Sequence, residues 1–157
     1  MSKSGIKVKG MFRLQLTKDG KIVGNSGWRE NQVVNLGFNQ YLVMSLGSIA
    51  GSKYVSHVAL GTGSAPGATA TTLEGEGAIE KRAAVTAASS SGSKTVRFTA
   101  TFNSTDSFVT ATKNISNIAL FNTSAQTTGT LFAGNTYTSS ACATNQNVNL
   151  TYDIIFS

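Results

Sequence analysis

The chain has 157 residues, 40% of them hydrophobic, which is enough to bury the core of one domain without disulfides. Only 13% are charged, and 16 glycines with many Ser and Thr residues indicate short strands joined by turns. A single cysteine, Cys142, excludes an intrachain disulfide and a cysteine-based metal site, and no apolar run approaches the roughly 18 residues of a membrane span. We expect one soluble domain over residues 1–157, made in a cytoplasm, with no membrane partner.

The net charge of +6 is concentrated near the N-terminus. Seven of the thirteen basic residues come before residue 30, namely Lys3, Lys7, Lys9, Arg13, Lys18, Lys21 and Arg29. This distribution favours contact between the N-terminal strands and an acidic surface. Residues 1–27 are therefore expected to form a basic N-terminal arm or hairpin.

Apolar and basic residues alternate from residue 6 to residue 17, which predicts a strand with one apolar and one basic face. Asp19-Gly20 then predicts a two-residue turn, because both central positions of such a turn need positive φ. The return strand begins at Lys21, which would face Lys18 across the turn. Either both lysines are solvated, or a carboxylate of a partner relieves the repulsion between them.

The stripe formed by Phe38, Tyr41, Leu42, Leu46 and Ile49 predicts one helix near residues 36–49, packed over a sheet edge. Asn35 can cap its start, and Gly47 or Gly51 can end it. Trp28 precedes the helix. We expect it to anchor the core at the seam between hairpin and helix, although a Trp beside an Arg can also stack on a sugar or base.

The most continuously apolar run of the second half, residues 115–122, predicts a central strand buried on both faces, followed by a partner strand at residues 130–133. Sixty residues earlier, residues 55–61 repeat its order of residue types. We interpret the two runs as equivalent strands of two packed sheets. Residues 95–102, 131–137 and 148–156 predict further strands, with Val96, Phe98, Ala100 and Phe102 pointing inward, so the sequence favours a β-sandwich.

Catalytic or metal-binding patterns are weak. The small-residue loop at 61–70 has no phosphate-binding lysine and is expected to be a mobile surface loop. Glu74 and Glu76 could bind a cation or act as an acid/base pair, but flanking glycines favour a solvated turn or a patch that pairs with a neighbour's basic hairpin. His57, the only histidine, lies in a strand without a partner at motif spacing, so we expect a packed or edge histidine, no cofactor, no metal and no enzyme.

The segments between residue 28 and residue 157, in their order along the chain, resemble those of a family of small virion structural proteins of tailed bacteriophages. The matching segments are Arg29-Glu30-Asn31-Gln32-Val33-Val34-Asn35-Leu36-Gly37, Ala59-Leu60-Gly61-Thr62-Gly63, Glu80-Lys81-Arg82, Phe98-Thr99-Ala100-Thr101-Phe102, Ile118-Ala119-Leu120-Phe121-Asn122, Gly129-Thr130-Leu131-Phe132-Ala133 and Tyr152-Asp153-Ile154-Ile155-Phe156. Proteins of this kind are capsid decoration (cement) proteins or tail, collar and fibre components. The resemblance implies an all-β, jelly-roll-like β-sandwich. The apolar stripe near residues 36–49 adds one short α-helix to this expected fold.

We therefore expect a virion protein that binds the major capsid protein on the outside of the shell, stabilises it and associates with itself as a dimer or trimer. The expected docking residues are Lys7, Lys9, Arg13, Lys18, Lys21 and Arg29. The alternative is a tail, collar or fibre component that binds a receptor or carbohydrate. It is disfavoured because the loops at 61–72, 89–93 and 123–129 contain no aromatic residue. Nucleic acid is not an expected partner, because the basic residues alternate along a strand without exposed aromatics between them.

Overall fold

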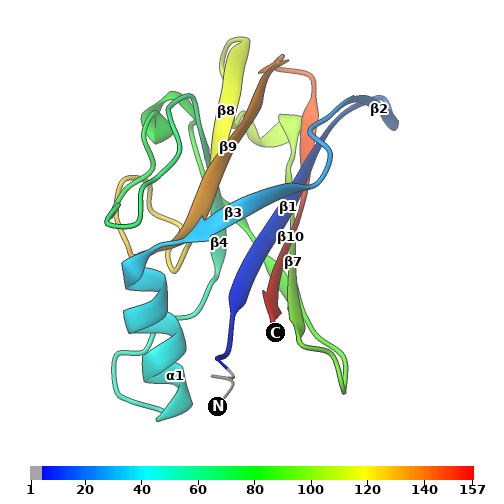
Figure 1. Cartoon of the computed structure of the whole chain (residues 1–157). Coiled ribbons are helices and arrows are strands. Elements are labelled where there is room, and N and C mark those ends of the chain that lie inside the picture. The colour runs from blue at the N-terminus through cyan, green and yellow to red at the C-terminus, as the bar shows by residue number, and fades with distance from the viewer. Residues whose placement is uncertain (1–4) are drawn as a thin grey trace.

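The structure, a computed structural model, describes residues 5–157, so Lys3 of the basic N-terminal set lies outside it. Strands dominate the described chain, and they form the two layers of a sandwich with one helical segment at its lower end (Figure 1). The predicted mainly β, sandwich-like fold with one short helix is confirmed.

The elements follow one another along the chain as β1 (Val8–Lys18), β2 (Lys21–Asn25), β3 (Arg29–Val33), η1 (Gly37–Val43), α1 (Met44–Leu46), β4 (His57–Gly61), η2 (Glu76–Ala78), β5 (Ala83–Ala84), β6 (Thr86–Ala88), β7 (Thr95–Phe102), η3 (Ser104–Asp106), β8 (Lys113–Phe121), β9 (Leu131–Cys142) and β10 (Asn147–Phe156). Neighbouring strands are antiparallel throughout, in the order β5-β4-β8-β9-β3-β1-β10-β7-β6, and β2 pairs with β1.

The N-terminal hairpin is present as predicted. Asp19 and Gly20 both have positive φ, 50° and 74°, and Lys18 lies opposite Lys21. Beyond the hairpin, β1 pairs with β10 from Val8 to Thr17 and is an inner strand of the sandwich. Within this hairpin, β2 and the turn project from the body of the molecule (Figure 1).

Strand β3 joins the two layers. Arg29, Glu30 and Asn31 pair with β1, whereas Gln32 and Val33 pair with β9. We call the layer of β2, β1, β10, β7 and β6 sheet A, and the layer of β9, β8, β4 and β5 sheet B. Because one short strand belongs to both layers, the polypeptide passes from sheet A to sheet B without a free edge between them.

Gly10 makes this crossing possible. It lies opposite Asn31 of β3, and a Cβ atom at Gly10 would overlap the Asn31 amide. The amide of Asn31 donates a hydrogen bond to the hydroxyl of Tyr152. A side chain at position 10 would therefore displace Asn31 and break a contact between three strands.

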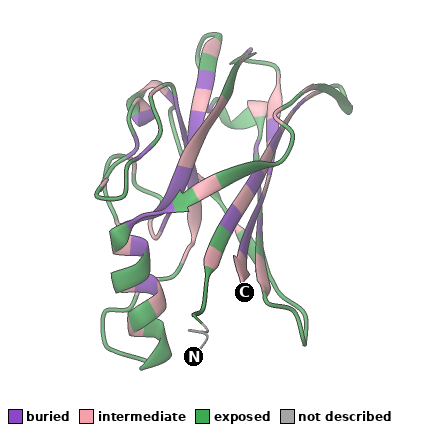
Figure 2. Ribbon diagram, in the orientation of Figure 1, coloured by how far each residue is buried: buried purple, intermediate pink, exposed green. Residues whose placement is uncertain are grey.

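Alternate residues of both sheets point into one core. Phe12 and Tyr152 stack with ring centroids 5.7 Å apart, and Phe102 packs on Phe108 at 5.3 Å. Phe98, Ala100 and Phe102 are buried as predicted, and Val96 is partly buried. The alternation is visible along β1 and β10, where buried and less buried residues follow one another (Figure 2).

Strand β8 is buried on both faces, as predicted. Ile118 and Leu120 belong to the main core, while Ala119 and Phe121 belong to a second small cluster with Leu73, on the outer side of sheet B. The interpretation of residues 55–61 is wrong in one respect, because β4 pairs directly with β8 in one sheet instead of occupying a second sheet. The two strands share a pattern because both are covered on both sides, by the core and by the chain around Leu73.

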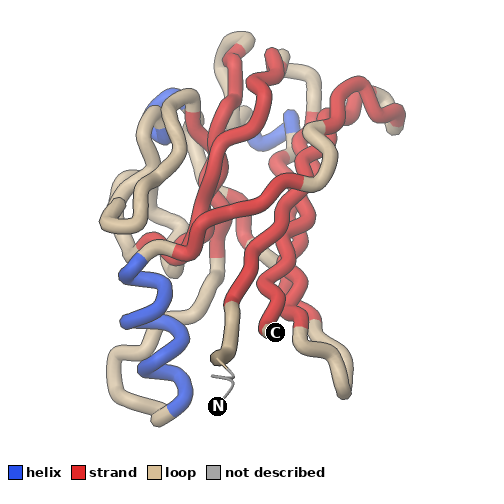
Figure 3. The backbone as a smooth tube through the Cα atoms, viewed as in Figure 1, coloured by secondary structure: helices blue, strands red, loops and turns tan. Residues whose placement is uncertain are grey.

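The helical segment (Figure 3) consists of the π-helix η1 followed by α1, and it ends at Gly47, one of the two glycines predicted to end it. Asn35 does not cap it, since the residue at the cap position is Leu36 and no side chain bonds there. Tyr41 is buried and its ring meets Phe132 at 5.0 Å. The rest of the predicted stripe is not buried as expected. Leu42 is half-buried, and the outlying members Phe38, Leu46 and Ile49 are exposed.

Candidate binding face

The outer surface of sheet A gathers most of the polar and charged side chains that the strands turn away from the core. We call it the outer face and define it by Lys9, Arg13, Trp28, Glu30, Arg97 and Asp153. Lys9 and Arg13 come from β1, Arg97 from β7 and Asp153 from β10. Each occupies the strand position that alternates with a buried residue, and β10 lies between β1 and β7.

Trp28 lies on this face and is 42% exposed, so the expectation that it anchors the core is wrong. Its ring lies 5.1 Å from the guanidinium carbon of Arg13 and 5.9 Å from that of Arg97. Cation–π contacts at exposed sites contribute about 0.5–1 kcal/mol each. The two arginines therefore restrain the ring while a large part of it stays open to solvent.

The loop before Trp28 explains its position. The hydroxyl of Ser26 accepts a hydrogen bond from the backbone N–H of Leu14, with the two atoms 2.9 Å apart, and Gly27 has a φ of +66°. This left-handed residue turns the chain over β1, so Trp28 arrives on the solvent side of the sheet.

Ion pairs offset much of the positive charge on the outer face. Arg97 binds Asp153 through two hydrogen bonds of 2.7 Å, and this contact raises the pKa of Arg97. Lys9 lies 2.7 Å from Glu30. Within residues 5–157, Arg13 has no carboxylate partner. The face therefore presents a weakly positive surface around an exposed ring, and not a dense basic patch.

The structure separates the six predicted docking residues. Lys7, Lys9 and Arg13 follow one another along one side of β1 and its N-terminal extension. Lys18 and Lys21 lie at the hairpin tip, and Arg29 is exposed with its Nε donating to the carbonyl of Ser26 at 3.1 Å. The sequence prediction missed Arg97 and Asp153. Alternation already turns both residues outward, but only strand order brings them beside Trp28.

The sequence predicts no exposed aromatic residue among the basic residues, but Trp28 is 42% exposed. The charges of the outer face still disfavour nucleic acid, because binding of the phosphate backbone depends on several cations that neutralise phosphates. On the outer face Lys9 and Arg97 are already paired with carboxylates.

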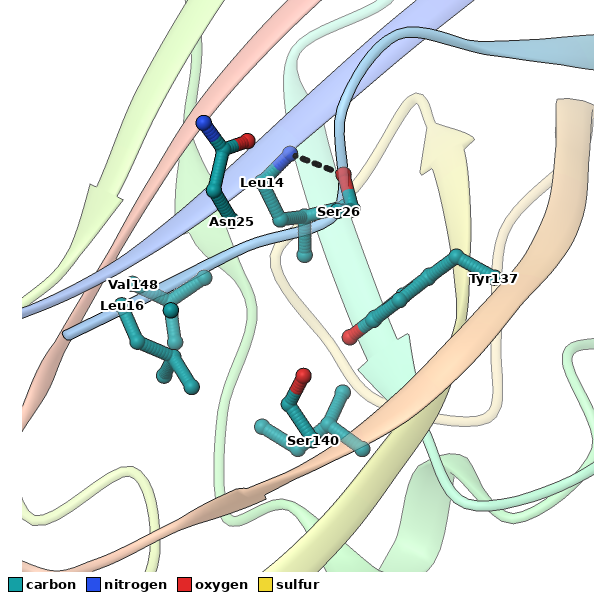
Figure 4. Close-up of a pocket in the computed structure, with 9 residues that line it drawn as sticks. Leu14, Leu16, Asn25, Ser26, Tyr137, Ser140 and Val148 are labelled. Carbon is teal, nitrogen blue, oxygen red and sulfur yellow. Dashed lines mark hydrogen bonds between the residues drawn. The ribbon is translucent and has the colours of Figure 1, made fainter. Parts of the chain in front are cut away.

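Sheet A and sheet B also enclose a cavity between Leu14, Leu16, Val148 and Tyr137 (Figure 4). Its volume is about 10 Å³, which is at the lower limit for one water molecule. The cavity is too small for an organic ligand.

The acidic segment folds differently from the prediction. Glu76 is buried and binds Arg82, so it is not part of a solvated turn. Glu74 is exposed and accepts a hydrogen bond from the hydroxyl of Ser64 and another of 2.9 Å from the backbone N–H of Ser64, and these two bonds lower the pKa of Glu74. The loop expected to be mobile is tied to β8, because the Asn117 amide donates to the carbonyls of Ser64 and Glu74 at 2.9 Å.

His57 opens β4, and its Nδ1 lies 2.8 Å from the hydroxyl of Ser56. Partial burial and the charge of Arg82 lower its pKa. No carboxylate hydrogen-bonds to it in the described part of the chain. Residues 5–157 also contain no group of three or more His, Cys, Asp or Glu residues that could hold a metal ion.

None of the helices in the described range is both long and apolar enough to cross a membrane. Comparison with known proteins adds no further assignment: no family model, curated protein or solved structure matches this chain.

Proposed function

We propose that this chain is a capsid decoration protein of a tailed-phage virion and that its outer face binds an acidic region of the major capsid protein. In this proposal it is a binding protein and not an enzyme. The observation that carries it is Trp28, exposed between Arg13 and Arg97 on a sheet. The virion assignment rests on the sequence resemblance described above.

Trp and Arg are the residues most enriched among those that dominate protein–protein binding energy. Immobilising a flexible side chain at an interface costs about 0.5–1.5 kcal/mol. Trp28 is already restrained by two guanidinium groups, so less of this cost falls on binding. The ring is therefore suited to be the central anchor of an interface.

Arg13 and Lys7 supply the attraction to an acidic partner, since neither has a carboxylate partner among the described residues. Such charges mainly raise the association rate and make binding sensitive to salt. A ligand that binds only the assembled shell stabilises it by RT ln(1 + [L]/Kd), about 2.7 kcal/mol per site at a hundredfold excess over Kd. Repeated over all sites, modest affinity would make the shell more resistant to internal pressure.

The test is to add purified protein back to particles stripped of it and to measure binding and the temperature of genome release. Trp28→Ala is expected to weaken binding roughly 30-fold, the effect of losing about 2 kcal/mol. Trp28→Phe keeps a ring between the arginines and should lose less. Arg13→Glu should weaken binding and reduce its salt dependence, whereas Lys81→Glu, at an exposed position away from the outer face, should bind as the unaltered protein does.

Reversal of the hairpin tip, Lys18→Glu with Lys21→Glu, tests the other half of the predicted docking set. If this change abolishes binding while Trp28→Ala does not, the tip docks and the outer face does not. Unchanged release temperature with saturated particles would contradict the decoration role.

One observation favours a second function, binding of a carbohydrate receptor. A hollow of about 430 Å³ is lined by residues that include Ser89, Ser90, Thr95, Arg97 and Asp153, and the guanidinium carbon of Arg97 lies 5.9 Å from the ring of Trp28. An exposed ring next to hydroxyl, carboxylate and guanidinium groups suits a sugar. Binding to host-cell glycans that is lost in Trp28→Ala, with no binding to stripped particles, would establish this alternative.

A further inference from the structure

The helical segment is unusual for a surface element because none of its ten residues, Gly37–Leu46, is charged. A helix that packs on one side normally presents polar and charged residues to water on the other. Here only Tyr41 is buried among the large side chains, and it is held by Phe132 and by a hydrogen bond from its hydroxyl to the carbonyl of Thr130. Leu42 packs partly against the core, whereas Phe38, Val43 and Leu46 are exposed.

Exposed apolar side chains gather around this helix. Of the nine large hydrophobic residues that are exposed in the described chain, six lie at this end of the molecule: Ile6 (84%), Phe38 (39%), Val43 (58%), Leu46 (92%), Ile49 (51%) and Tyr54 (76%). We call this set the apolar end. Figure 2 shows the helix mostly in the colour of exposed residues, beside the start of β1 and the end of β10.

The apolar end is hollowed. A groove of about 460 Å³ runs between the helix and the ends of β1 and β10, and its lining includes Ile6, Phe38, Leu46 and Phe156 but no charged residue. A neighbouring groove of about 160 Å³ shares Leu42 and Phe156 with it and extends the surface to Tyr54. The two grooves therefore adjoin and form one mostly apolar depression, in which Lys53 is the one charged lining residue and the 92% exposed Leu46 is among the residues that line it.

We propose that the apolar end is the interface of a twofold symmetric homodimer, in which Leu46 of each copy enters the groove of the other. The six exposed residues offer on the order of 700 Å² of accessible surface, close to the ~800 Å² that each partner buries in a standard interface and more than the largest patch of most monomers. A surface that contains both a protrusion and a matching groove can pair with itself around a twofold axis.

Charge selects a second copy over an acidic partner. The chain carries a net charge of +6, yet the larger groove has no charged lining residue and Lys53 is the one charged residue that lines the smaller groove, so two copies can meet over the larger groove with few like charges nearby. The outer face, by contrast, lies on sheet A and not on the helix. Dimerisation would therefore leave Trp28 free, and the proposal goes beyond the capsid-binding function without depending on it.

The test uses the purified full-length chain alone, with its molar mass measured by sedimentation over a range of concentrations. The unaltered protein is expected to have twice the 16.3 kDa mass of one chain. Leu46→Glu and Val43→Glu should each abolish the dimer, because a charge would be buried without a partner. Both residues are exposed, so circular dichroism should stay close to that of the unaltered chain, and the unfolding temperature should fall only by the concentration-dependent contribution of dimerisation.

Ile22→Glu is the matched control, since Ile22 is 59% exposed but lies on β2, away from the apolar end. It should remain a dimer. A monomer at every concentration, a trimer, or a dimer that persists in Leu46→Glu would overturn the proposal. Because no particle is present, failure here is distinguishable from failure of capsid binding, which is measured with Trp28 and Arg13 variants.

Discussion

The environment of single ionisable residues has consequences for stability that the sequence pattern does not reveal. Burial raises the pKa of the Cys142 thiol to about 11, which makes the only cysteine a poor nucleophile near neutral pH. Tyr152 is fully enclosed between the sheets, and burial raises the pKa of its hydroxyl well above the usual value. His57 is shifted in the opposite direction, because for a base burial disfavours the protonated form.

We predict that His57 makes the protein less stable as the pH falls from 7.5 to 5.5. The folded state holds the pKa of His57 below its ordinary value of 6.5, so the unfolded chain takes up the proton first. The contribution of neutral His57 to the free energy of unfolding is complete above pH 6.5 and is lost as the pH decreases. The free energy of unfolding, measured with urea at both pH values, should decrease less in His57→Gln. An equal decrease in both proteins would contradict the prediction.

At the level of elements, a buried ion pair between two neighbouring segments also reaches a third segment that is distant in sequence. The guanidinium of Arg82, just before β5, binds Glu76 of η2 through contacts of 2.5 and 3.0 Å. It also donates to the carbonyl of Thr123 at 3.0 Å and lies 3.7 Å above the ring of Phe121. The pair thus ties η2 and the start of β5 to the loop between β8 and β9.

We predict that Arg82→Met destabilises the protein by about 3–5 kcal/mol, because it leaves the Glu76 carboxylate buried without its partner. The double variant Glu76→Leu with Arg82→Met should recover a large part of this loss, since neither charge is then buried. Glu30→Gln provides the control. It breaks the exposed pair with Lys9 and should change stability by no more than about 1 kcal/mol. Denaturant titrations measure all three, and equal effects of Arg82→Met and Glu30→Gln would refute the role of burial.

For the whole molecule, the shared strand β3 determines how the two layers unfold. Its first half belongs to sheet A and its second half to sheet B, and side chains from both sheets form one core. Neither sheet can lose β3 without exposing part of that core. The sandwich is therefore expected to behave as one cooperative unit.

We predict that secondary structure and aromatic packing are lost together. Far-ultraviolet circular dichroism, which should show a spectrum dominated by strands, and near-ultraviolet dichroism should give the same denaturant midpoint. Phe12→Ala, in β1 of sheet A, should move both midpoints equally, because Phe12 packs on Tyr152 and on Tyr137 of β9. Two separate transitions would mean that the sheets unfold independently.

The amino-acid sequence alone was sufficient for the features that depend on neighbours along the chain. These include the turn at Asp19-Gly20, the helix that ends at Gly47, the alternation of β7 and the burial of β8 on both faces. Each reflects a local preference or a side-chain period, which a single segment expresses by itself.

Tertiary structure decided the features that depend on which segments meet. The alternation of apolar and polar residues along a strand shows which face of the sheet each residue lies on, but it does not show which strand lies beside it. Sequence could therefore not place β4 beside β8, join Arg97 and Asp153 to Trp28, or bring Arg82 to Glu76. For the same reason the helical stripe predicted a buried face, although the sandwich offers a surface for Tyr41 and only partial cover for the rest. The exposed Trp28 and the apolar end, on which both proposals rest, exist only because the folded sheets leave those side chains uncovered.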